Sequence, residues 1–249
     1  MNARLKKILS RISFYIGVAT FALFCGFPMI WMVLTSIKPD GDILRATPVF
    51  WSWDTHLDHY RNLFDQTDFL IYFVNSITVA TSATLLTIVI ATLAAYGITR
   101  FRFTGREYIA GGMLFTYMFA PILIVVPFYI LMKNYGLINT KLGLVLAYTT
   151  FSLPFSMWLL RSFFQSIPLD LEEAAMTDGA SRPQAVVRVI VPLAFPGVIA
   201  VSIFTFIVAW NDYLFARVLT SANDMKTLPI GMNDLYNACL LYTSDAADE

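Results

Sequence analysis

Charged residues are scarce in this sequence. Asp, Glu, Lys and Arg make up 14% of the 249 residues, whereas hydrophobic residues make up 57%. A soluble domain usually carries about 25% charged residues, which keep its surface hydrated. The shortage excludes an ordinary soluble enzyme and predicts an integral membrane protein. Because several apolar runs hold about 20 residues, the length of a membrane-spanning helix, we expect an all-α fold.

Residues that commonly carry chemistry are also few. No G-x-x-x-x-G-K-[ST] phosphate-binding loop occurs, so this chain is not expected to bind or hydrolyse ATP itself. Cys25 and Cys239 are too few for a disulfide framework, and the two histidines, His56 and His59, have no cysteine nearby. We therefore expect no catalytic site, no metal and no cofactor. The formal net charge of zero gives no indication of a nucleic-acid partner.

Five long apolar runs dominate the sequence. We expect transmembrane helices at residues 14–34, 71–98, 108–132, 142–160 and 197–216, within one domain of residues 1–238. The fifth run reaches span length only if it starts near Val189 or continues to Ala216, and Pro192 and Pro196 favour the second choice. Prolines inside the runs, such as Pro121, are expected to be kinks that helix packing tolerates. The first four runs contain no acidic or basic residue, which argues against a proton-coupled carrier.

The basic residues predict the orientation of these spans. Those that flank the runs most closely lie on one side: Arg4, Lys6, Lys7, Arg11, Arg100, Arg102, Arg106, Arg161, Arg182 and Arg188. Short loops rich in Lys and Arg stay in the cytoplasm. We therefore expect a cytoplasmic N-terminus and a cytoplasmic loop between the fourth and fifth runs, residues 161–196.

This loop contains a polar stretch, residues 167–192, whose local signals are those of two short helices. Pro168 and the three acidic residues that follow it suit the positive end of a first helix. Gly179 can take the left-handed conformation that ends such a helix. Ser181, with Gln184 three residues later, has the spacing of a capping box that starts the second. In the first helix, Leu171, Ala174 and Ala175 share a face that another protein's backbone could approach closely.

The pattern Glu173-Ala174-Ala175, Gly179, Val189 and Val191-Pro192 resembles the EAA signature of binding-protein-dependent ABC-transporter permeases. The string Asp178-Gly179-Ala180 is similar to the carbohydrate branch, which includes maltose-type permeases. Further resemblance lies in Ser36-Ile37-Lys38-Pro39, Asn75-Ser76 and Trp210-Asn211-Asp212.

The resemblance implies a type I ABC importer permease fold, with five of the family's six transmembrane helices present. It implies a subunit of the bacterial cytoplasmic (inner) membrane that moves a sugar or oligosaccharide by alternating access. Its partners would be a second permease, two ATP-binding cassette ATPase subunits, an extracytoplasmic solute-binding protein and membrane lipid. The polar stretch would be the coupling loop that docks on an ATPase, through Leu171, Glu173, Ala174, Ala175, Asp178, Gly179 and Pro192.

Polar and aromatic residues within the runs are candidates for the sugar path. Hydroxyls of a sugar ring accept and donate hydrogen bonds, and its C–H face stacks on aromatic rings. We expect such a path to involve Asn75, Tyr117, Tyr148 and Asn211. The alternative is that these residues serve packing or anchor the helices at the membrane interface.

Other interpretations of the whole chain remain open at this point. The polar stretch also fits an amphipathic segment on the membrane surface, and Ala175, Gly179 and Ala185 match the loose spacing of a DNA-binding helix-turn-helix. The chain could be an ABC permease for a peptide, an amino acid or phosphate. It could also be a stand-alone channel or a secondary carrier.

Residues 239–249, CLLYTSDAADE, resemble a translated sequencing adapter rather than protein. We therefore predict that the intact gene continues past Ala238 with another apolar run of about 20 residues, enough for a sixth span. Sequencing the genomic locus through this point checks the prediction. A full-length clone with a stop codon here would contradict it.

Overall fold

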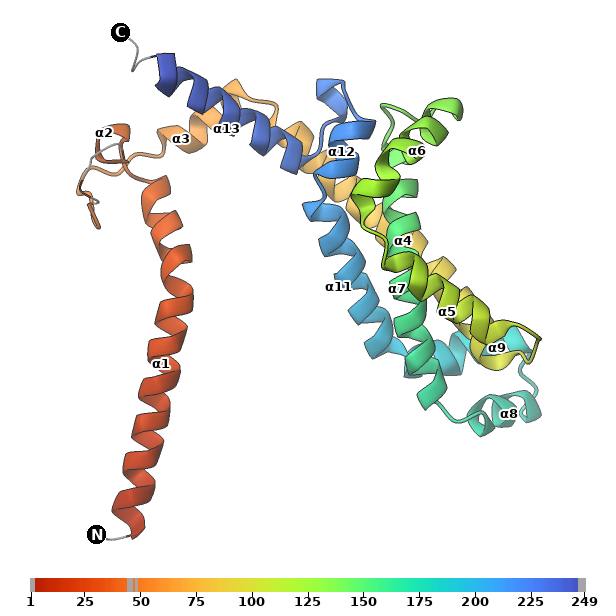
Figure 1. The fold of residues 1–249 in the computed structure, drawn as a ribbon. Helices are drawn as coiled ribbons and strands as arrows, with labels where there is room; N and C mark the ends of the chain where they lie inside the picture. The colour runs from red at the N-terminus through yellow and green to blue at the C-terminus, as the bar shows by residue number, and fades with distance from the viewer. Residues whose placement is uncertain (1–2, 44–46, 48, 246–249) are drawn as a thin grey trace. The chain divides into compact units, whose positions relative to one another are not determined.

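The computed structural model describes residues 3–43, 47 and 49–245. The chain divides into two compact units, residues 1–67 and 68–249. All regular elements in the described residues are helices, so the all-α prediction is confirmed (Figure 1).

The first unit is dominated by one long helix, α1 (Ala3–Ser36). Its segment Arg11–Ser36 is long and apolar enough to cross a membrane, and none of its most apolar window is buried within the protein. Two short helices follow, α2 (Asp40–Ile43) and α3 (Asp58–Gln66). A hydrogen bond of 2.7 Å between the hydroxyls of Ser36 and Tyr60 connects α3 to the end of α1.

The second unit is built on three long helices that pack together, α4 (Phe69–Arg100), α7 (Lys141–Ser166) and α11 (Phe195–Asn211). Alanines on α4, including Ala83 and Ala91, are fully buried, and their small side chains let the neighbouring helices approach closely. The remaining elements are α5 (Arg106–Tyr117), α6 (Pro121–Asn134), α8 (Asp170–Thr177), α9 (Arg182–Ala185), a π-helix (Val186–Ile190), α10 (Val191–Leu193), α12 (Leu214–Leu219), a 3-10 turn (Asn223–Met225) and α13 (Leu228–Asp245).

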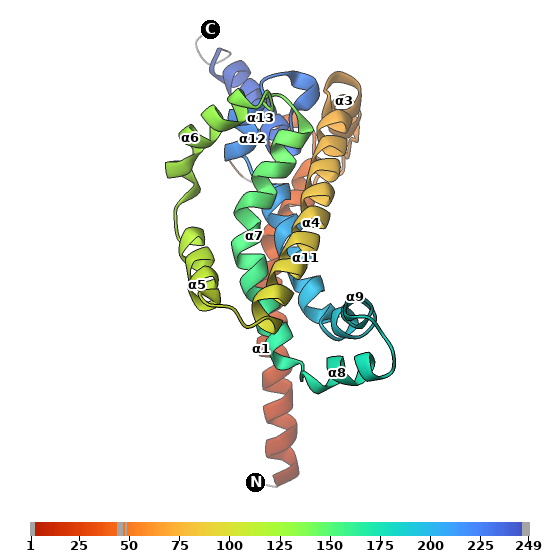
Figure 2. The same cartoon turned by 90° about the vertical axis from the view of Figure 1, so that its right-hand side faces the viewer.

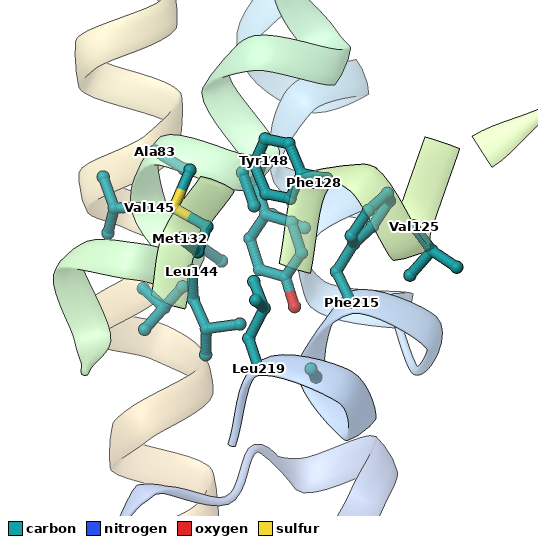
Figure 3. Close-up of a cluster of buried hydrophobic side chains, with 14 of the residues drawn as sticks. Ala83, Val125, Phe128, Met132, Leu144, Val145, Tyr148, Phe215 and Leu219 are labelled. Carbon is teal, nitrogen blue, oxygen red and sulfur yellow. The ribbon is translucent and has the colours of Figure 1, made fainter. Parts of the chain in front are cut away.

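Two apolar clusters hold this unit together. In the first, Phe128 of α6 and Phe215 of α12 pack near Tyr148 of α7, as Figure 3 shows. The second lies toward the other end and joins Leu160 of α7 to Ile190 of the π-helix. The polar stretch between α7 and α11 is therefore anchored in the core through its second half.

Within the described residues, three helices are long and apolar enough to span a membrane by length and composition, namely Arg11–Ser36, Phe69–Arg100 and Lys141–Ser166. The count rises to five if each of two bent pairs is one span: Arg106–Tyr117 with Pro121–Asn134, bent by 100°, and Arg182–Leu193 with Phe195–Asn211, bent by 75°. These five candidates overlap the five runs expected from the sequence.

The third and fifth runs differ from expectation in detail. Residues 108–132 do not form one kinked helix, because Ala120 is extended, with ψ of 127°, and Pro121 starts a new helix there. A residue before proline is driven out of the helical region, which explains the break. The fifth helix ends at Asn211 instead of continuing to Ala216. The carboxylate of Asp212 accepts hydrogen bonds from the backbone N–H groups of Phe215 and Ala216, which starts the separate helix α12.

At the end of the chain, α13 runs to Asp245 and so includes part of the stretch expected to be an adapter. The rest of that stretch, residues 246–249, lies outside the described residues.

Candidate functional site

The polar stretch after α7 forms a compact helical loop at one end of the α4–α7–α11 bundle. Figures 1 and 2 show α8 and α9 together at this end, which is also where α4 leads into α5. Beyond α9, the chain stays helical through Leu193 and then turns by 75° into α11. Pro196 lies in the first turn of α11, where its missing N–H group leaves no bond unmade.

Gly179 ends α8 as the sequence predicts. Its φ angle is +93°, which confirms the left-handed conformation. The N–H of Ala180 donates to the carbonyl of Ala175 at 3.0 Å, and the N–H of Gly179 donates to that of Met176 at 3.1 Å. A Cβ atom at Gly179 would meet no heavy atom within 4 Å. A side chain there would be disfavoured by the backbone conformation alone.

The predicted capping box is also confirmed. The N–H of Ser181 donates to Oε1 of Gln184 at 2.9 Å, and the second helix begins at the next residue, Arg182. Pro192 lies inside the last helical turn, Val191–Leu193, and the helix ends one residue after it.

The side chains of α8 divide between an outer and an inner face. Leu171, Glu173 and Ala174 are exposed, and Leu171 retains 43% of its accessible surface. Ala175 is half-buried, while Glu172 is only 2% exposed. The face expected to meet another protein is thus largely open, and the two neighbouring glutamates point to different environments.

The buried carboxylate of Glu172 sits among three partners. Tyr96 Oη donates to Oε1 at 2.5 Å, and Arg100 Nε lies 3.2 Å from Oε2. Arg182 Nε is 4.0 Å from Oε1, and its guanidinium lies over the ring of Phe101 at 5.4 Å. Burying a carboxylate is costly without such compensation, and these partners join α8 to α4 and α9.

Sequence reasoning missed this arrangement, because it gave Glu172 only the general role of an acidic residue near a helix start. The available signal was the spacing of Tyr96 and Arg100. They lie four residues apart at the end of an apolar run, so they share one helix face that needs a polar partner.

The four residues expected to line a sugar path fall into two groups. Asn75 and Tyr148 are buried, and their side chains have partners within the chain. Asn75 Nδ2 donates to the carbonyls of Asp224 and Lys226 at 2.8 and 2.9 Å, whereas Tyr148 Oη donates to Asp212 at 3.1 Å. These bonds give both residues a structural task.

Tyr117 and Asn211, in contrast, are exposed. Tyr117 lines a cavity of about 290 Å³ between α5, α6, α7 and α11. Most of the lining is apolar or aromatic, and Phe155, next to the cavity, packs against Tyr117 with ring centroids 5.4 Å apart. Among the described residues no group of three His, Cys, Asp or Glu could hold a metal ion.

Comparison with known proteins identifies the family. The sequence profile of the binding-protein-dependent transport system inner membrane component matches residues 88–238, a range that includes the whole helical loop. The chain belongs to this family.

Relatives and a solved structure agree. The chain is 38% identical over 234 residues to the inner membrane ABC transporter permease protein YcjP of Escherichia coli (strain K12), covering 93% of this chain and 84% of that protein. It is 37% identical over 229 residues to the trehalose/maltose transport system permease protein MalG of Thermococcus litoralis, covering 91% and 82%. A bacterial ABC transporter involved in import of the acidic polysaccharide alginate superposes with a TM-score of 0.77 at 25% identity, covering 92% of this chain and 80% of that one. The predicted ABC importer permease fold is confirmed, and this permease is a multi-pass inner-membrane protein.

Substitution of Asn75 tests whether this residue stabilises the structure or lines the sugar path. Asn75→Leu is expected to lower the free energy of unfolding by about 1 to 3 kcal/mol, because two carbonyl groups lose their donor. Thermal unfolding of the purified protein in detergent measures this effect. Thr78→Val is the control, since the exposed Thr78 hydroxyl donates only within its own helix, to Val74 at 2.7 Å. Unchanged stability with lost transport in Asn75→Leu would assign the residue to the path instead.

Proposed function

We propose that this permease is a membrane-spanning subunit of an ATP-driven importer for a sugar or oligosaccharide. The observation that carries the proposal is that several of its relatives are named for sugar substrates. They include permeases named for trehalose/maltose and for diacetylchitobiose, and the superposed transporter imports alginate. Sugars therefore form the substrate class that best fits this chain.

The partners follow from the family. A binding-protein-dependent system needs a solute-binding protein outside the membrane, and this chain pairs with a second permease and two ATPase subunits. Since the sequence has no phosphate-binding loop, the ATPases supply the energy. The N-terminus and the helical loop lie in the cytoplasm, in agreement with the basic residues that flank the spans.

Within this assembly α8 is the coupling helix. The exposed Leu171 provides an apolar contact, and the small side chains of Ala174 and Ala175 let the ATPase surface come close to the helix backbone. Glu173 and Asp178 are exposed beside them and suit pairing with basic residues of the ATPase. Closure of the ATPases on ATP would displace this helix and favour the outward-facing state of the permease pair.

Sugar passes along the accessible polar and aromatic groups. Tyr117 and Asn211 are candidates for the path because their side chains remain exposed, and the aromatic cavity beside Tyr117 can stack on the C–H face of a sugar ring. Asn75 and Tyr148 contribute indirectly, by holding the helices that carry these groups.

The coupling assignment is tested by two substitutions in the loop. Gly179→Val forces a β-branched residue into a left-handed conformation, at about 1 to 3 kcal/mol, and Ala175→Trp enlarges the docking face. We expect both variants to insert in the membrane but to lose uptake of a maltose, trehalose and diacetylchitobiose panel. Co-purification of the ATPase subunits, at matched permease levels, separates lost attachment from lost coupling.

Gly112→Val is the matched control for this experiment. A Cβ atom at Gly112 also meets open space, but Gly112 lies in α5 and is not among the glycines with positive φ. It should therefore retain uptake. Normal uptake by Gly179→Val combined with Ala175→Trp would show that this loop does not couple to an ATPase.

The energy source gives a separate test. The purified chain alone is expected to hydrolyse no ATP, whereas the assembled complex hydrolyses it faster when sugar-loaded binding protein is added. Steady-state phosphate release measures both. ATP hydrolysis by the isolated chain would overturn the assignment of this activity to separate ATPase subunits. Sugar uptake by the chain alone in liposomes would favour a stand-alone carrier.

A further inference from the structure

The two halves of the loop are attached to the bundle in different ways. The second half is anchored by apolar packing, with Ile190 and Ala194 fully buried against residues of α7 and α11. The first half, α8, packs against α9 and the π-helix. Its connection to α4 runs through long polar side chains that meet at Glu172.

From this geometry we infer that Glu172 is a positioning residue, which ties the coupling helix α8 to the loop end of α4 and carries its displacement into the bundle. The inference rests on the proposed function and extends it. Glu173 faces outward, where an ATPase can reach it, whereas Glu172 acts entirely inside the permease.

Burial supports this assignment. The Glu172 side chain is 3% exposed and that of Arg100 is 9% exposed, so a partner protein has almost no access to either charge. Arg100 also donates from Nη2 to the carbonyl of Ile167 at 3.0 Å, just after α7. The Glu172 carboxylate thus connects α8 with α4 and with Arg182 of α9. Its partner Arg100 also binds the carbonyl at the start of the loop.

The charges of the cluster oppose separation of α8 from α4. If α8 moved away from α4, Glu172 would lose Tyr96 Oη and the Arg100 guanidinium together, leaving buried charges without partners. Such a separation is unfavourable, so α8 and the end of α4 move as one body. Since α4 packs against both α7 and α11, its displacement reaches the helices around the cavity.

A double-mutant cycle in the complete complex tests the inference. Glu172→Gln and Arg100→Gln are each expected to lower the sugar transported per ATP hydrolysed by about tenfold, within the usual range of coupling effects. The ATPase subunits should remain bound, because both side chains are buried within the permease. The double variant should lose no more than either single variant, since the two residues act as one unit.

Two further variants sharpen the result. Tyr96→Phe keeps both charges and removes only the hydroxyl donor, so it should lower the transport ratio less, by about two- to threefold. Asp170→Asn is the matched control, because Asp170 is an exposed carboxylate on the same helix; it should keep the ratio within about twofold. The probe is whichever sugar of the maltose, trehalose and diacetylchitobiose panel the wild-type complex transports.

A normal transport ratio in Glu172→Gln, additive losses in the double variant, or release of the ATPase by Glu172→Gln would overturn the positioning role. If Glu172→Gln does not accumulate in the membrane, the ratio measured for Tyr96→Phe decides, and an unchanged ratio overturns the inference. A wild-type complex that transports no sugar would instead refute the proposed function.

Discussion

Burying a carboxylate is unfavourable unless cations and hydrogen-bond donors compensate its charge. Glu172 has such partners where α8 lies beside the end of α4. Its partners come from α4 and α9, so keeping them favours the observed position of α8. The outward direction of Leu171, Glu173 and Ala174 follows, because residues one or two positions away on a helix point elsewhere. The outward-facing candidate docking face thus accompanies the burial of Glu172 beside Arg100.

The same rule governs the other polar side chains in this apolar chain. Asn75 bonds two carbonyl groups near the 3-10 turn, roughly 150 residues later in the sequence, and Asp212 starts α12 while accepting from Tyr148. Asn75 lies within α4 and Tyr148 within α7, and both reach segments outside these helices: Asn75 satisfies two backbone carbonyls, whereas Tyr148 bonds the Asp212 side chain that starts α12. Such bonds hold the irregular segments against the long helices.

The sequence predicts the features that depend on neighbouring residues. Gly179 and the pair Ser181 and Gln184 act within one turn of helix, and both have the expected conformation. It does not predict Glu172, because the partner Arg100 is 72 positions away and only packing brings the two together. The break before Pro121 has a local cause, the steric effect of proline on Ala120, but the sequence does not single it out, because Pro28, Pro127 and Pro154 stay inside helices.

The two attachments of the loop differ in kind. Apolar packing around Ile190 is non-directional, whereas the Glu172 cluster depends on the length and direction of a hydrogen bond and on an ion pair. In the proposed coupling, a displacement that starts at α8 would therefore pass to α4 through the Glu172 cluster. The continuous helical stretch from Arg182 to Leu193 includes a π-helix, a rare geometry that is frequently found at functional sites. The loop thus has a specific polar connection to α4 through α8 and a non-specific apolar one to α7 and α11 through its second half.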